Sequence, residues 1–137
     1  LSVTSVGGSV ALVVRVAFLV AVEPGDTLGR EGADGPAAAI TIDDPQGDHI
    51  SSIQIQFEKT GDEWYLVDQS LNGTYIQRGS GWQKVLSEKG RKRLEKKGND
   101  YTDRHGEEPP ESIQLNDDDF IALVHPTYGV NLTFKTE

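Results

Sequence analysis

The stretch DQSLNGT, residues 68–74, lies between two short apolar runs, WYLV at 64–67 and TYIQ at 74–77. Asn-Gly between two such runs is the strongest short-range sequence signal for a type I′ turn, so one interpretation is a β-hairpin. A second interpretation is a calcium loop, because Asp, Ser, Asn and Gly stand at positions one, three, five and six of the EF-hand spacing. Position twelve requires a bidentate Glu but holds Gly79, so we expect no metal site here.

Short runs rich in Val, Ile and aromatic residues recur on both sides of this stretch, separated by Gly, Pro, Asn and Asp. This pattern is typical of a sandwich of short β-strands. In one run Ile53, Ile55 and Phe57 alternate with Gln54 and Gln56, which places Gln54 on the face opposite the core. The predicted strands are 10–14, 16–22, 39–42, 53–57, 64–67, 74–77, 112–115, 120–124 and 130–134. The chain is therefore predicted to be all-β.

The composition restricts the function. The 137 residues include 22 Asp or Glu and 13 Lys or Arg, and the net charge is −9. A negatively charged protein is a poor partner for nucleic acid or an anionic membrane, because both are negatively charged and bind positively charged surfaces. The same excess occurs in salt-adapted proteins, so a halophilic source is one interpretation. The absence of cysteine excludes disulfides and thiolate metal sites and fits a reducing compartment, so we expect a cytoplasmic protein.

The domain organisation is simple. The chain begins at Leu1 and contains no methionine, so we expect it to be a piece of a longer protein. We predict a tail at residues 1–9 and one domain at 10–137. The long apolar run 10–22 is interrupted by Arg15 and falls short of the roughly 20 residues that cross a bilayer, so it predicts buried strands and no membrane helix.

Residues 79–111 are predicted to be an insertion in the sandwich. Within it, SEKGRKRLEKK at 87–97 has helical composition, with Ser87 as the N-cap and Gly98 as the terminating glycine. Leu94 is almost its only apolar residue, so we expect a solvated helix that buries no face. The alternative is a second contact for an acidic partner or a nucleic acid. The basic cluster consists of Lys89, Arg91, Lys92, Arg93, Lys96 and Lys97.

Four motifs stand in a characteristic order: DTLGR at 26–30, ISSIQIQF at 50–57, DQSLNGT at 68–74 and IQLNDDDFIALV at 113–124. In this order they resemble the forkhead-associated (FHA) family, which is marked by Gly-Arg, a Ser-x-x-His loop, Asn-Gly-Thr, and Leu-x-x-Gly-Asp before a late strand. The resemblance implies an FHA-like (SMAD/FHA) β-sandwich of about eleven strands. It also implies that loops at one end bind phosphothreonine peptides.

The resemblance assigns roles to particular residues. Arg30 offers a guanidinium to the phosphate, and Ser51 offers a hydroxyl. Asn72 holds the peptide backbone beside the phosphothreonine, because an amide can donate and accept at once. The remaining implied peptide contacts are Ser52 and Leu71, and the implied structural residues of the motifs are Gly29, Gln54, Gly73 and Thr74.

Three positions depart from the family pattern. Ser52 stands where the family commonly has Arg, so Arg30 is expected to carry the phosphate charge alone and the affinity to be reduced. Gln54 stands where the family has a bracing His, and its amide could keep the brace. The glycine of Gly-Asp is replaced in the run 117–119, a turn position for which we expect no ligand role.

No sequence motif supports an enzyme. The nucleotide-binding, nucleophile-elbow and zinc-protease patterns are absent, and His49, His105 and His125 lack partners at a fixed spacing. We expect no catalytic residue, cofactor or metal. The predicted function is a phosphothreonine-binding module of a larger signalling protein, whose partner is phosphorylated by a Ser/Thr kinase. The alternatives are a scaffold with a degenerate pocket that binds proteins independently of phosphorylation, or nucleic-acid contact through the basic insertion.

Overall fold

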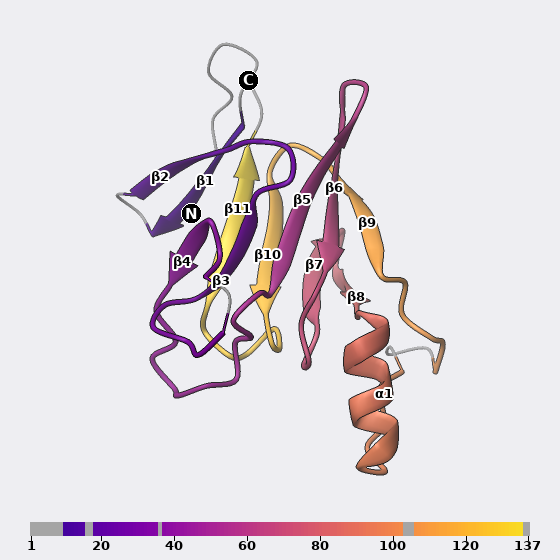
Figure 1. Ribbon diagram of the computed structural model, residues 1–137. Coiled ribbons are helices and arrows are strands. Elements are labelled where there is room, and N and C mark those ends of the chain that lie inside the picture. Colours follow the sequence, from indigo (N-terminus) through magenta and orange to yellow (C-terminus); the bar gives the residue numbers. More distant parts are fainter. Residues whose placement is uncertain (1–9, 16–17, 36, 103–105, 136–137) are drawn as a thin grey trace.

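The computed structural model describes residues 10–15, 18–35, 37–102 and 106–135, and Figure 1 shows their arrangement. The predicted tail 1–9, the first two residues of the predicted strand 16–22 and His105 lie outside this part of the chain. The elements are β1 (Val10–Arg15), β2 (Phe18–Val22), β3 (Thr27–Arg30), β4 (Ile40–Ile42), β5 (Ile55–Thr60), β6 (Glu63–Asp68), β7 (Thr74–Arg78), β8 (Gly81–Val85), α1 (Glu88–Lys96), β9 (Ser112–Leu115), β10 (Asp119–Leu123) and β11 (Asn131–Lys135).

The strands form two sheets, which confirms the predicted all-β sandwich. The first sheet has the order β2-β1-β11-β10-β7-β8, and the second has the order β4-β3-β5-β6-β9. Phe57 and Leu66 of the second sheet and Ile121 and Phe134 of the first are fully buried in one core. Burial of each such side chain contributes about 1.5–3 kcal/mol, so this shared core holds the sheets together.

The stretch 68–74 is a crossover between the sheets, so the hairpin interpretation is wrong. It connects β6, which pairs with β5 and β9, to β7, which pairs with β8 and β10. The Asn-Gly dipeptide does not distinguish a hairpin from a crossover here, because the short apolar runs on its two sides can form strands of the same sheet or of different sheets. Tight hairpins lie on either side of it instead: between β5 and β6, where Thr60 pairs with Glu63, and between β7 and β8, where Arg78 pairs with Gly81.

Two strands, β3 and β8, were not predicted from the sequence. Strand β3 contains a single large apolar residue, Leu28, so it shows no alternation. Strand β8 lies inside the predicted insertion 79–111, yet it pairs with β7 along its length, from Thr74 opposite Val85 onward. The excursion from the sheet therefore starts only after Val85.

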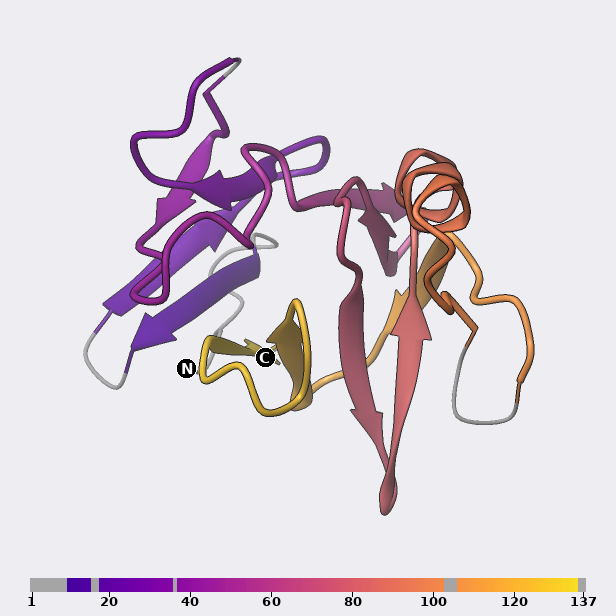
Figure 2. The same cartoon turned by 90° about the horizontal axis from the view of Figure 1, so that it is seen from below.

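The predicted helix is present. Ser87 is its N-cap and accepts the Gly90 N–H, and Gly98 beyond the C-cap has a φ of 72°. None of the helices in the described part of the chain has the length and apolar character needed to cross a membrane. Helix α1 lies at the end of the sandwich where the loops around β3 and β4 lie, and Figure 2 looks onto that end.

The turn before β10 explains the altered Gly-Asp motif. Asp118 takes the place of the glycine and has a φ of 67°, a left-handed conformation that Asp tolerates better than most residues. Asp119, which follows it, is only 7% exposed, accepts the Asn116 N–H and forms an ion pair with Arg78 at 2.7 Å. The acidic run is thus partly buried and structural.

Candidate functional site

A cavity of about 190 Å³ opens between three loops and helix α1. The loops follow β3, precede β5 and join β6 to β7, and they come together because the strands that carry them end at the same end of the sandwich (Figures 1 and 2). The lining residues are Arg30, Asp34, Asp48, His49, Ile50, Ser51, Ser52, Leu71, Asn72, Lys89 and Arg93. All five peptide contacts expected from the sequence line this one cavity.

Arg30 is the last residue of β3 and is held by the loop before β5. Its backbone N–H donates to Ser51 O at 3.0 Å, and its side-chain Nε donates to Ile50 O at 2.9 Å. These bonds orient the guanidinium while leaving its terminal N–H groups available to a ligand. The side chain is half-buried, so its charge acts in a medium less polar than water.

Gly29 lets β3 approach that loop closely. A Cβ at this position would lie 1.7 Å from the backbone oxygen of Ser52 and 3.2 Å from the Ala38 side chain. No side chain fits in that space. In the Gly-Arg pair, Gly29 therefore allows the close approach of the two backbones, and Arg30 provides the anchored cation.

Ser51 joins the loop before β5 to the crossover loop. Its Oγ accepts the Leu71 N–H at 3.0 Å. The hydroxyl keeps its own proton for donation, because it has used only an acceptor position. Ser51 can therefore hold the two loops together and donate to a phosphate oxygen at the same time.

Gln54 is completely buried, which corrects the expectation that it faces away from the core. The alternation fails because β5 begins only at Ile55, so Gln54 belongs to the preceding loop. Its Oε1 accepts the Ser51 N–H at 2.9 Å, and its Nε2 donates to Gly73 O at 2.8 Å and to Thr74 Oγ1 at 3.1 Å. The amide thus forms a brace between the two loops that line the cavity.

Asn72 is anchored at both ends of its amide. Its Nδ2 donates to His49 O at 2.8 Å, and its Oδ1 accepts from Arg93 Nη1 at 3.3 Å. An amide has two N–H donors and two acceptor lone pairs, so one of each remains. This is the set needed to bind a peptide bond in both directions.

Asp68 organises the crossover loop from inside the protein. The carboxylate is 2% exposed and accepts from Ser70 Oγ and Thr74 Oγ1, both at 2.8 Å, and from the Ser87 N–H at 2.8 Å. Burial raises its pKa to about 6, although the bonds from Thr74 and Ser70 favour the ionised form. Among the described residues, no three acidic or histidine side chains are grouped to hold a metal ion.

Removal of the Asp68 carboxylate should destabilise the fold. Asp68→Ala leaves several buried donors without an acceptor, at about 1–3 kcal/mol each, so we expect a loss of about 3 kcal/mol or more in urea unfolding. Asp62→Ala, at the exposed tip of the β5–β6 hairpin, is the matched control and should change stability little. A loss for Asp68→Ala no larger than that of the control would contradict this role.

The raised pKa also predicts a pH dependence. The unfolded carboxyl titrates near 4, so between about pH 4 and 6 the folded state binds the proton more tightly and the Asp68 contribution to stability falls as the pH rises. Comparison with Asp68→Asn, which does not titrate, isolates this contribution. The stability advantage of the wild type over Asp68→Asn should be largest below pH 4 and smaller above pH 6, and parallel curves would refute the assignment.

The sequence analysis named Lys89 and Arg93 as members of the basic cluster but did not place them at the cavity, where they add two cations beside Arg30. It also missed how α1 docks: Gly90 is buried, and a Cβ there would lie 2.7 Å from the backbone oxygen of Ser70. Ser87 Oγ donates to the same oxygen at 2.7 Å. The expectation of a helix that buries no face is therefore wrong. A glycine inside a helical stretch was the available signal of this close approach.

Comparisons with known proteins place the chain in a family. A family model described as FHA domain matches residues 27–97, slightly more than half of the chain. No curated protein matches the sequence. Several solved structures share the fold.

Three of these structures illustrate the likeness. An FHA domain studied for phosphothreonine-dependent interactions is 19% identical, with a TM-score of 0.55 over 94% of this chain and 97% of that one. The FhaA FHA domain complexed with the intracellular domain of Rv3910 is 17% identical, with a TM-score of 0.53 over 91% and 98%. The FHA domain of human APLF, in complex with an XRCC1 bisphospho peptide, is 17% identical, with a TM-score of 0.53 over 88% and 90%.

Proposed function

The chain belongs to the FHA-domain family, and from this premise we propose that it binds phosphothreonine peptides in the cavity lined by Arg30, Ser51 and Asn72. FHA domains are interaction modules, and the proposed function is recognition without catalysis. One observation carries the proposal. The same cavity is lined by the half-buried guanidinium of Arg30, the Ser51 hydroxyl, whose proton can still be donated, and the Asn72 amide, which keeps one N–H donor and one acceptor lone pair.

The chemistry of phosphothreonine matches these groups. A phosphothreonine brings about −1.5 to −2 charges and three acceptor oxygens, which require a cation and several fixed donors. Arg30 supplies the cation and Ser51 a donor, while Asn72 is positioned for the peptide backbone. The net charge of −9 opposes a phosphopeptide at long range, but salt screens it beyond about 8 Å at physiological ionic strength. Contact geometry in the cavity therefore decides the affinity.

The partner is proposed to be a threonine-phosphorylated protein, the product of a Ser/Thr kinase. The domain itself is proposed to be a module of a larger signalling protein. The comparison structures support this class of partner, since one was studied for phosphothreonine-dependent interactions and another holds a bisphospho peptide. A cytoplasmic location stays a prediction.

Peptide titration tests the proposal. Calorimetry with a degenerate peptide pool centred on phosphothreonine, and with the same pool carrying unphosphorylated threonine, should give measurable binding only for the phosphorylated pool. Equal binding of both pools would refute phosphate recognition and favour the phosphorylation-independent scaffold. Strongly salt-dependent binding of nucleic acid with no peptide binding would refute it in favour of the basic helix as a nucleic-acid contact.

A further inference from the structure

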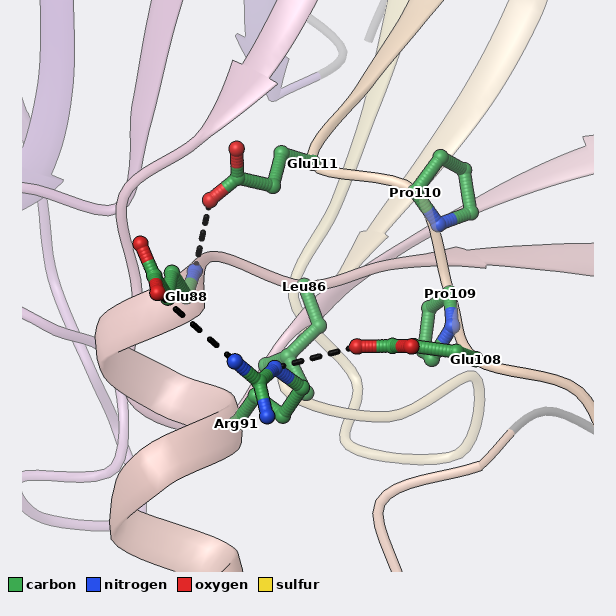
Figure 3. Close-up of a pocket in the computed structure, with 7 residues that line it drawn as sticks. All are labelled: Leu86, Glu88, Arg91, Glu108, Pro109, Pro110 and Glu111. Carbon is green, nitrogen blue, oxygen red and sulfur yellow. Dashed lines mark hydrogen bonds and ion pairs between the residues drawn. The ribbon is translucent and has the colours of Figure 1, made fainter.

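Four of the five cations of α1 fall into two groups that differ in their partners. On one flank Arg91 forms ion pairs with Glu88, Glu95 and Glu108 at 3.7, 3.3 and 3.0 Å. Figure 3 shows Arg91 between Glu88 and Glu108, beside a separate cavity of about 310 Å³. Lys92 pairs with Glu88 at 3.4 Å. These cations are neutralised by the protein itself, and the pair between Arg91 and Glu108 also holds α1 against the segment that leads to β9.

The other flank presents Lys89 and Arg93 to the proposed peptide cavity. They are four residues apart, so their side chains lie on the same face of the helix one turn apart. Within the described part of the chain, neither forms an ion pair with a carboxylate. Arg93 instead donates to Asn72 Oδ1, which places its guanidinium beside the residue proposed to hold the peptide backbone.

The position of this flank is fixed by the docking of α1. The contacts of Ser87 and Gly90 with Ser70 and Asp68 are buried and involve backbone atoms, so the helix cannot swing away without exposing unpaired polar groups. The backbone of this flank is therefore held at the edge of the cavity before any ligand arrives. The Arg93 side chain is held further by its bond to Asn72, whereas the Lys89 side chain is exposed. A group that is held in place before binding, such as Arg93, loses little entropy when a ligand binds.

The cavity is also asymmetric in charge. Lys89 and Arg93 line it from α1, whereas Asp34 and Asp48 line it from the loops after β3 and before β5. A negatively charged ligand side chain is attracted by the helix and repelled by the two carboxylates. Such a combination of attraction and repulsion selects between partners and fixes the direction of binding.

We propose that α1 determines peptide specificity: Lys89 and Arg93 bind acidic side chains that flank the phosphothreonine on one side only. This inference rests on the proposed function. It adds that the partner peptide is acidic on the flank that lies against α1 and not on the flank that lies against Asp34 and Asp48. Two cations one helical turn apart fit two acidic residues, or one acidic residue and a second phosphate.

Three synthetic phosphothreonine peptides test the inference: one with two Asp residues before the phosphothreonine, one with two Asp residues after it, and one neutral. For the wild type, one acidic peptide should bind about five- to tenfold more tightly than the neutral peptide, and the other should not. In Lys89→Ala/Arg93→Ala this ratio should fall to about one. In Lys89→Glu/Arg93→Glu the preference should change to a fourth peptide, which has two Lys residues at the positions of the preferred Asp residues.

The control is Lys92→Glu/Lys96→Glu, which makes the same charge change on the same helix and should keep the wild-type ratio. Circular dichroism and thermal unfolding verify that each variant is folded. If the wild type does not distinguish phosphorylated from unphosphorylated peptides, the proposed function itself fails. If it does, but shows no preference for one acidic flank, or if the control loses the preference as the Lys89/Arg93 variants do, only the role of α1 is refuted.

Discussion

Arg30→Ala is expected to reduce the affinity for a phosphothreonine peptide about 100-fold, more than any other single substitution in the cavity. The reason is geometric as well as electrostatic. The Nε bond to Ile50 and the backbone bond to Ser51 aim this guanidinium, and it is half-buried, so its charge is less screened than that of the exposed Lys89. Its loss removes charge-assisted bonds of about 1.5–3 kcal/mol each. Isothermal titration calorimetry measures the change.

Two further variants show whether the Arg30 effect is specific. Arg30→Lys keeps the charge but loses the planar fork and the bond to Ile50, so it should recover only part of the affinity. Lys96→Ala removes one exposed positive charge from the end of α1, outside the cavity, and should bind like the wild type. An Arg30→Ala protein that is folded and binds within about threefold of wild type would show that the phosphate lies elsewhere.

Gly29→Ala should have the second-largest effect on peptide affinity, because it alters both the fold and the cavity. The new methyl group would lie 1.7 Å from the Ser52 backbone oxygen, which no side-chain rotation can relieve. The loop that carries Ser51 and anchors Arg30 must therefore move. We expect a loss of about 3 kcal/mol in unfolding free energy and at least about tenfold weaker peptide binding.

A second glycine separates this steric effect from backbone strain. Gly25 has a φ of 87°, and a Cβ there meets no atom within 4 Å. Gly25→Ala should therefore cost about 1–2 kcal/mol of stability through its left-handed conformation and leave binding unchanged. If Gly29→Ala weakened binding no more than Gly25→Ala, the close approach would have no role in shaping the cavity.

The sequence was sufficient to predict the fold and five of the residues outside α1 that line the cavity, but not the contributions of Asp34, Asp48, His49 and Ile50. Arg30, Ser51 and Asn72 come from three separate motifs, and the structure brings them to one cavity although Arg30 and Asn72 lie 42 positions apart in the chain. Strands β3 and β8 were missed because neither shows apolar alternation. In both, pairing with neighbouring strands overrides the weak local pattern.

The contribution of α1 could not be predicted, for a physical reason. The packing of a helix is usually recognised in a sequence by an apolar stripe, and α1 has none. It docks instead through the Ser87 hydroxyl, the Gly90 backbone and the Asp68 carboxylate. Those contacts depend on a buried carboxylate from a distant strand. Gln54 was misplaced for a related reason: the predicted strand 53–57 began two residues before β5, and so included a side chain that serves as a brace.

The most direct test of phosphothreonine binding in this cavity is an NMR titration of the ¹⁵N-labelled domain with a phosphothreonine peptide and with the unphosphorylated peptide of the same sequence. We predict that only the phosphorylated peptide shifts the signals of the Arg30 side-chain Nε and of the backbone amides of Ser51, Ser52, Leu71 and Asn72. Equal shifts with both peptides, or shifts confined to residues away from these loops, would contradict the account.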